Sequence, residues 1–127
     1  MSTAIELVRQ WHDAVNAADT ERLATLVSND VEIGGPRGTA QGVDVLIDWV
    51  GRSHIQMVPT DWYQQGDTLV VCQRATWPEE DGTPGIPQKV GTVFVVTDGR
   101  ISRIARYSGL SDAFAETGLS EANRIEV

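Results

Sequence analysis

Residues 11–42, WHDAVNAADTERLATLVSNDVEIGGPRGTAQG, decide the fold because they predict two helices and a strand in close succession. Apolar residues recur at helical spacing in the residues just before this segment and in the first residues of the segment itself. This spacing predicts a helix over about residues 4–17. Asp19 is placed to cap a second, two-turn helix. Ser28-Asn29-Asp30 is typical of a turn, and residues 31–33 then read as a short strand.

Working outward from this stretch, a third helix is predicted over residues 43–53, after a glycine-rich connection over residues 34–42. Within that helix Asp48 and Arg52 stand four residues apart and are expected to form an ion pair. The segments that follow are rich in Val, Ile, Thr and aromatic residues. They are predicted as strands over residues 55–65, 68–77, 88–97 and 101–107.

Turn-forming residues separate these predicted strands. Gln65-Gly66-Asp67 and Asp98-Gly99-Arg100 are typical of tight hairpins, so an antiparallel meander is expected. Residues 78–87 are acidic and rich in proline, which predicts a loop. A last helix is expected over residues 111–118, and residues 121–127 are expected to be a tail that frays or crosses to a neighbour. This order predicts an α+β fold, with a curved antiparallel sheet packed on three N-terminal helices.

The length and charge of the chain limit what it does. With 127 residues it is expected to form a single domain, 1–127, with one core. A formal net charge of −8 argues against binding to nucleic acid and to anionic membranes, because both need a basic surface. No apolar run reaches the roughly 20 residues of a membrane-spanning helix, and a cytoplasmic location is expected.

Metal and cofactor motifs are missing from the sequence. Cys72 is the only cysteine, which excludes an intrachain disulfide and favours a buried or pocket-lining position. His12 and His54 are far apart and there are no clustered thiols, so no metal site is predicted. Residues 34–38 lack the lysine and the hydroxyl residue of a phosphate loop. We therefore expect no metal and no cofactor.

Several short motifs occur here in an order that is found in a known superfamily. They are Asn16-Ala17-Ala18-Asp19, Asn29-Asp30-Val31, Gly42, Gly66-Asp67-Thr68, Asp98-Gly99-Arg100-Ile101 and Tyr107. Together they resemble the SnoaL-like branch of the nuclear-transport-factor-2-like superfamily, which includes ketosteroid isomerase, SnoaL-like polyketide cyclases and scytalone dehydratase. The resemblance implies a cone-shaped fold with an internal pocket and, as in many relatives, a homodimer paired through the outer face of the sheet.

The resemblance also places the catalytic positions of the steroid isomerases. Their carbonyl-polarising tyrosine would lie at Trp11, their aspartate base at Gly35, and their protonated aspartate near Thr92. An indole donates a hydrogen bond but is no comparable acid, and glycine has no side chain. The ketosteroid-isomerase mechanism is therefore not expected.

Strand alternation in the same alignment predicts which side chains face the pocket. The inward-facing set is Val70, Cys72, Arg74, Thr76, Gln88, Val90, Thr92, Phe94, Ile104, Arg106 and Ser108. Arg74 and Arg106 would then form a subsite for a carboxylate, enolate or phosphate. Two alternatives stay open: the register differs by one residue and turns these side chains outward, or the arginines pair with Asp61, Glu32 or the acidic loop at residues 78–87.

Aromatic side chains are expected to form much of the pocket wall. The predicted ligand-pocket residues are Trp11, Val15, Trp49, Trp62, Cys72, Arg74, Thr92, Phe94 and Arg106. His54, near the expected mouth of the cone, is a candidate general base, and an exposed helix-end histidine is the alternative. His12, next to Trp11, is expected to point elsewhere on its helix.

The sequence thus predicts a SnoaL-like protein that binds a small hydrophobic or anionic molecule. An isomerase, cyclase or hydrolase step is the expected type of chemistry, and His54, Arg74 and Arg106 are the candidates for it. The alternative is a non-catalytic protein interaction module with a vestigial pocket. A cavity plugged by tryptophans, with both arginines paired internally, would favour that alternative.

Overall fold

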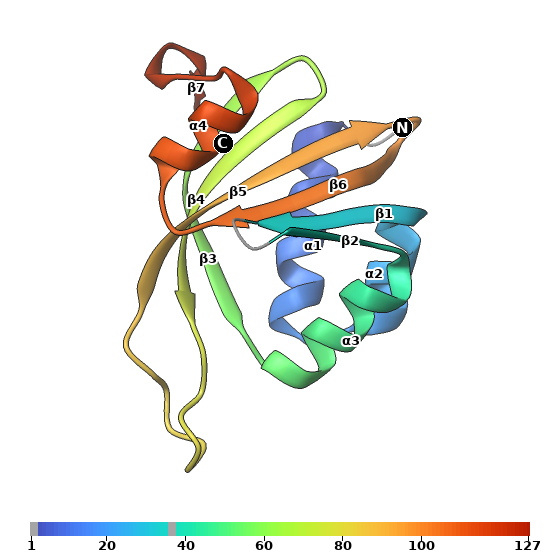
Figure 1. Cartoon of the computed structure of the whole chain (residues 1–127), viewed down its shortest axis with the longest axis vertical. Coiled ribbons are helices and arrows are strands. Elements are labelled where there is room, and N and C mark those ends of the chain that lie inside the picture. Colours follow the sequence, from blue (N-terminus) through green and yellow to red (C-terminus); the bar gives the residue numbers. More distant parts are fainter. Residues whose placement is uncertain (1–2, 36–37) are drawn as a thin grey trace.

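Four helices and a seven-stranded sheet make up residues 3–35 and 38–127, the part of the chain that this computed structural model describes (Figure 1). In chain order the elements are α1 (Ala4–Asn16), α2 (Thr20–Leu26), β1 (Val27–Gly35), β2 (Gly38–Gln41), α3 (Val43–Ser53), β3 (Gln56–Gln65), β4 (Thr68–Thr76), β5 (Gln88–Thr97), β6 (Arg100–Tyr107), α4 (Leu110–Thr117), the short 3-10 helix η1 (Glu121–Asn123) and β7 (Arg124–Ile125).

Side-chain caps begin the first two helices. The hydroxyl of Thr3 accepts a hydrogen bond from the backbone N–H of Glu6 at 3.1 Å, and α1 follows. The carboxylate of Asp19 accepts one from the backbone N–H of Arg22 at 3.2 Å, and α2 follows as predicted. Each cap satisfies a backbone donor that the first helical turn leaves free.

The strands lie in the order β2-β1-β6-β5-β4-β3-β7. Neighbours from β6 to β3 are antiparallel, as the meander predicts, and Gly66 and Gly99 adopt φ values of 59° and 78° in the hairpin turns. β1 and β6, however, run parallel, so this one pair departs from the expected antiparallel pairing. A parallel pair needs a long crossover, and α3 with the intervening hairpins supplies it.

Two predictions around β1 are also wrong. Ser28-Asn29-Asp30 is no turn but part of β1, where an irregular register between Val27 and Glu32 accommodates these polar residues. The glycine-rich connection over residues 34–42 contains the strand β2, which pairs with β1. Residues 36–37 of that connection lie outside the described residues.

The C-terminal segment packs against the sheet of the same chain, so the expected fraying or crossing of residues 121–127 is wrong. β7 pairs with β3 through Trp62 opposite Ile125 and Tyr63 opposite Arg124. Arg124 forms an ion pair with Asp61, 63 residues away. The prediction failed because these contacts are long-range and leave no local signal in the sequence.

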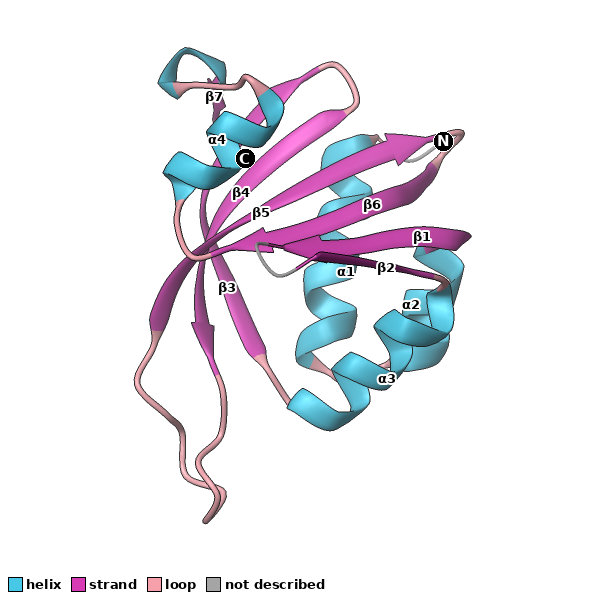
Figure 2. Cartoon of the chain, in the orientation of Figure 1, coloured by secondary structure: helices cyan, strands magenta, loops and turns pink. Residues whose placement is uncertain are grey.

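The sheet buries apolar side chains on both faces. Helices α1, α2 and α3 cover one face, and α4 covers part of the other (Figures 1 and 2). The helix-covered core contains Trp11, Leu46, Leu69, Val71 and Phe94 among others. The smaller cluster under α4 contains Tyr63, Val70, Val93, Ala105, Ala113 and Leu119. Membership of one cluster or the other shows on which face of the sheet a buried strand residue lies.

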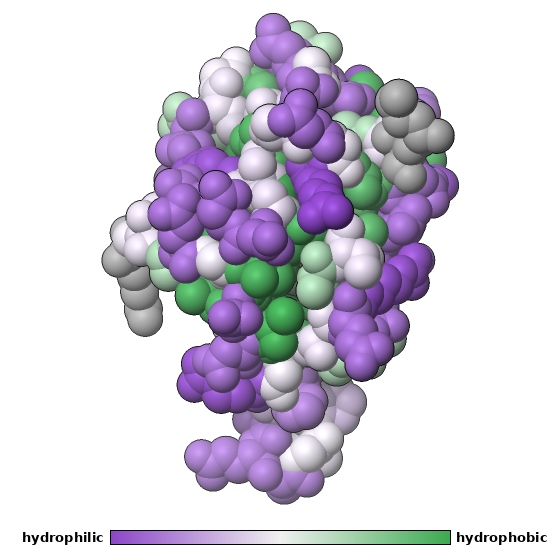
Figure 3. Space-filling model, turned by 90° about the vertical axis from the view of Figure 1, so that its right-hand side faces the viewer, coloured by the Kyte–Doolittle hydropathy of each residue, from purple (hydrophilic) through white to green (hydrophobic). Residues whose placement is uncertain are grey.

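The loop between β4 and β5 extends away from the rest of the molecule, at the bottom of Figure 1. A single isolated bridge joins Pro78 and Pro84 within it. In the side view of Figure 3 this end is hydrophilic, whereas apolar side chains gather in the middle of the molecule. The segment is therefore a loop, as predicted.

Candidate functional site

Strand β4 faces the opposite way from the prediction. Leu69 and Val71 belong to the helix-covered core and Val70 to the cluster under α4, so Cys72 and Arg74 point away from the helices. The prediction was wrong by one residue because β4 carries a continuous apolar run that is buried on both faces. Such a run shows no alternation from which the inner face can be read.

Strands β5 and β6 face as the alternation predicts. Phe94 and Ile104 are opposite each other and belong to the helix-covered core. Thr92 and Arg106 form the next opposed pair on the same face, one step closer to the open end of the cone. Of the two predicted arginines, only Arg106 therefore faces the helices.

A hydrogen-bonded chain of three polar side chains crosses the core, although His12 was expected to point away from it. The Nδ1 of His12 lies 2.7 Å from the carbonyl oxygen of Val8, which can only accept, so Nδ1 carries the proton. Gln73 Nε2 then donates to His12 Nε2 at 2.9 Å, and Thr92 Oγ1 donates to Gln73 Oε1 at 2.6 Å. All three side chains are buried.

The buried position of His12 keeps its imidazole neutral. Removal from water lowers the pKa of His12 to about 4, despite the opposing hydrogen bond to Val8. The expectation for this residue failed because the neighbouring Trp11 also packs inward: their rings are in edge contact, with centroids 5.1 Å apart. His12 is therefore part of the core and not an exposed base.

The deep end of the cone is filled by predicted pocket residues. The ring centroids of Trp11 and Phe94 are 4.9 Å apart, and those of His12 and Trp62 are 5.8 Å apart. Val15 packs in the same cluster. Trp11 is 1% exposed, and its indole N–H has no hydrogen-bond partner among the described residues. These side chains form a packed wall rather than an open space.

The open end of the cone holds a cavity of about 780 Å³. The β1–β2 hairpin, Trp77 at the end of β4, the first residues of β5 and the last of β6 line it. Arg106 is its only predicted ligand-pocket residue. Trp77 was not among the predicted pocket residues. It follows β4, and the prediction of which β4 side chains face the helices was wrong.

Arg106 lies against two tryptophans at this cavity. Its guanidinium carbon is 5.0 Å from the ring centroid of Trp77 and 5.6 Å from that of Trp49 on α3. The Nη1 atom is buried, and no group in the described part of the chain accepts its hydrogen bond. Burial lowers the pKa of the Arg106 guanidinium.

The acids expected to neutralise the arginines are bound elsewhere. Glu32 pairs with Arg103 at 2.5 Å, and Asp61 pairs with Arg124. No ion pair links Arg74 or Arg106 to any carboxylate in residues 3–35 and 38–127. The alternative in which both arginines are paired internally is therefore contradicted for the described residues.

The other candidate residues lie apart from the cavity. His54 is exposed at the C-cap of α3 and does not line the cavity at Arg106. Arg74 is exposed on the opposite face of the sheet. The described residues contain no group of three side chains arranged to hold a metal ion. None of the helices among them has the length and apolar character needed to span a membrane.

The comparison with protein families identifies this architecture. The family model described as the SnoaL-like domain matches residues 8–104. The chain belongs to the SnoaL-like domain family. The resemblance predicted from the sequence motifs is thereby confirmed. Among curated proteins, none matches this SnoaL-like chain.

Solved structures share the fold at low sequence identity. A nuclear-transport-factor-2-like protein of unknown function from Cytophaga hutchinsonii is 14% identical, with a TM-score of 0.75 over 90% of this chain and 96% of that one. A candidate polyketide cyclase from Sinorhizobium meliloti is 20% identical, with a TM-score of 0.69 over 83% and 99%. TerC, co-crystallised with polyporic acid, is 21% identical, with a TM-score of 0.73 over 91% and 97%.

Proposed function

We propose that this SnoaL-like protein binds a small hydrophobic anion at the open end of its cone, with Arg106 as the group that recognises the charge. The observation that carries the proposal is the buried Nη1 of Arg106, which has no acceptor among the described residues. A buried donor without a partner costs about 1–3 kcal/mol, and more when the group is charged. A carboxylate or enolate oxygen in the cavity would satisfy it.

The surroundings of Arg106 support an aromatic or other apolar ligand. Trp49 and Trp77 contact the guanidinium and hold it in place by cation–π attraction. Val90 and Ile33 add apolar surface to the cavity. TerC, which has the same fold, was co-crystallised with an acidic small molecule, which supports the same kind of occupant here.

The proposed chemistry is stabilisation of negative charge. Among the described residues that line the cavity there is neither a carboxylate nor an imidazole to act as an obvious base. A fixed guanidinium does favour an enolate that develops in an isomerase, cyclase or hydrolase step. Arg106 is therefore the residue on which we place any such activity, and His54 and Arg74 have no part in it.

A matched pair of probes tests this proposal. Unfolding temperatures are measured with 2-naphthoate and with 2-naphthamide, which share the ring but not the charge. The carboxylate at 100 times its dissociation constant is expected to add about 2.7 kcal/mol to the free energy of unfolding. R106Q should lose that gain, while the exposed R100Q control should keep it. Equal shifts for both probes, or an undiminished shift in R106Q, contradict the proposal.

The alternative of an interaction module has less support. The outer face of the sheet, through which a homodimer is predicted to pair, is covered over Tyr63, Val70 and Val93 by α4 and its neighbours. Val58, on the same face, is 56% exposed. Homodimer formation stays a prediction, and light scattering coupled to gel filtration tests it directly.

A further inference from the structure

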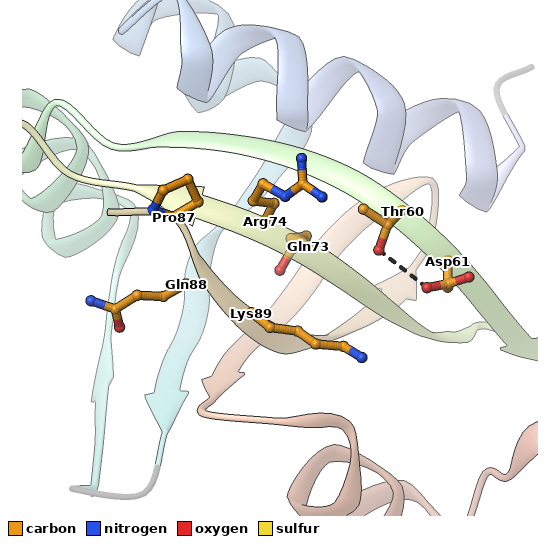
Figure 4. A pocket seen from close by; sticks show the side chains of 7 residues that line it. All are labelled: Thr60, Asp61, Gln73, Arg74, Pro87, Gln88 and Lys89. Carbon is orange, nitrogen blue, oxygen red and sulfur yellow. Dashed lines mark hydrogen bonds between the residues drawn. The ribbon is translucent and has the colours of Figure 1, made fainter. Parts of the chain in front are cut away.

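A second hollow lies on the sheet face opposite to Arg106 and carries the only lysine of the chain, Lys89. Its volume is about 330 Å³. Figure 4 shows that its side chains come from three adjacent strands: Thr60 and Asp61 from β3, Arg74 from β4, and Lys89 from β5. We call it the Arg74–Lys89 groove.

Two positively charged residues occupy neighbouring positions of the sheet at this groove. Arg74 and Lys89 are directly opposed in the pairing of β4 with β5, and both point away from the helices. Side chains at directly opposed positions of antiparallel strands are close neighbours, and like charges there destabilise the sheet. Within the described residues neither cation forms an ion pair.

Asp61, an acid that lines the groove, does not relieve this repulsion. The carboxylate of Asp61 is bound by Arg124, and its second oxygen accepts a hydrogen bond from the hydroxyl of Thr60 at 3.1 Å. The chain carries 18 acidic residues against 10 basic ones, so carboxylates are abundant, and yet none in residues 3–35 and 38–127 forms an ion pair with these two cations. An anion from outside the chain would remove the repulsion.

We propose that the Arg74–Lys89 groove binds the phosphate group of a small molecule. Gln88 and Lys89 line both this groove and the cavity at Arg106, whereas Arg74 lines the groove and not the cavity. A phosphate carries close to two negative charges and three acceptor oxygens. The guanidinium of Arg74 supplies two parallel donors, and the ammonium of Lys89 supplies a compact charge from the neighbouring strand. The proposal does not depend on the function assigned to Arg106.

Titration with inorganic phosphate tests the site. Backbone amide shifts of the labelled protein are followed by NMR at constant ionic strength. Saturable shifts are expected on β4 and β5. R74Q and K89Q should each bind phosphate roughly tenfold more weakly, and the double variant should not bind it. R106Q should bind as the wild type does. Absence of saturable shifts in the wild type, or their loss in R106Q alone, overturns the proposal.

A second measurement uses the unmodified protein. Because Lys89 is the only lysine, an amine-acetylating reagent reports on one side chain, and the α-amino group serves as an internal control. Phosphate is expected to slow acetylation of Lys89 at least fivefold without slowing that of the α-amino group. Acetylation of Lys89 at the same rate with and without phosphate overturns the proposal. If the protection of Lys89 from acetylation instead increases with protein concentration, the groove is an interface between two copies of the chain. That result also overturns the proposal.

Discussion

Gly35 lies against the backbone of Arg106: a Cβ atom placed on Gly35 would stand 2.7 Å from the carbonyl oxygen of Arg106. Side chains do not approach a carbonyl so closely, so β1 and β6 meet here only because the residue is glycine. The resemblance to steroid isomerases places their aspartate base at this position. In this protein, the space for that side chain is taken by the strand that carries Arg106.

We expect Gly35→Ala to lower the free energy of unfolding by about 1–3 kcal/mol, because the added methyl group forces β1 and β6 apart. Gly51→Ala is the matched control, since no atom would lie within 4 Å of its Cβ and alanine favours the α3 helix. Urea unfolding measures both variants. A Gly35→Ala protein as stable as the wild type would show that the strands adjust freely.

Stability is expected to fall as the pH falls from about 6.5 to about 4. His12 is protonated more readily in the unfolded chain than in the core, where its pKa is about 4. Its stabilising effect is therefore complete above pH 6.5 and is lost on acidification, by roughly 3 kcal/mol in total. Urea unfolding at several pH values should show that the free energy of unfolding of His12→Leu falls less steeply on acidification than that of the wild type. The exposed His54→Gln control should keep the wild-type slope.

Gln73→Leu should destabilise the protein by about 2 kcal/mol, because it leaves both Thr92 and His12 without their partner in the core. The exposed Gln65→Leu control should have little effect. Adding Thr92→Val to Gln73→Leu should then cost less than Thr92→Val alone, since the hydroxyl has already lost its acceptor. Strictly additive free energies of unfolding would mean that the three side chains do not act as a chain.

His54→Gly is expected to stabilise the protein by about 1 kcal/mol. His54 ends α3 in the left-handed region with φ of 51°, a conformation that costs energy for any residue with a Cβ. Ser53→Gly, one residue earlier and still helical, should instead destabilise the protein by up to about 1 kcal/mol. Thermal unfolding distinguishes the two. Carboxylate binding should be unchanged in His54→Gly, because His54 lies outside the cavity.

The helices and the four long strands could be predicted because their signals are local. Capping by Asp19 and the turn at Gly66 act within a few residues of the chain. The site could be predicted only in part. Arg106 shares a face with Ile104, two residues earlier, as alternation predicts, whereas Arg74 lies on β4, where both faces are apolar and the facing depends on tertiary packing. Trp77 and Gln73 were missed for the same reason.

The pairing of β7 with β3 has a consequence for how the molecule behaves in a crowded solution. The outermost strands of the sheet are β2 and β7, which are four and two residues long. Short outer strands offer few free backbone groups to a passing chain. Without β7, the ten-residue β3 would be the border of the sheet and a template for intermolecular strand addition. By pairing with Trp62 and Tyr63, the two residues of β7 thus close that part of the β3 edge to strand addition.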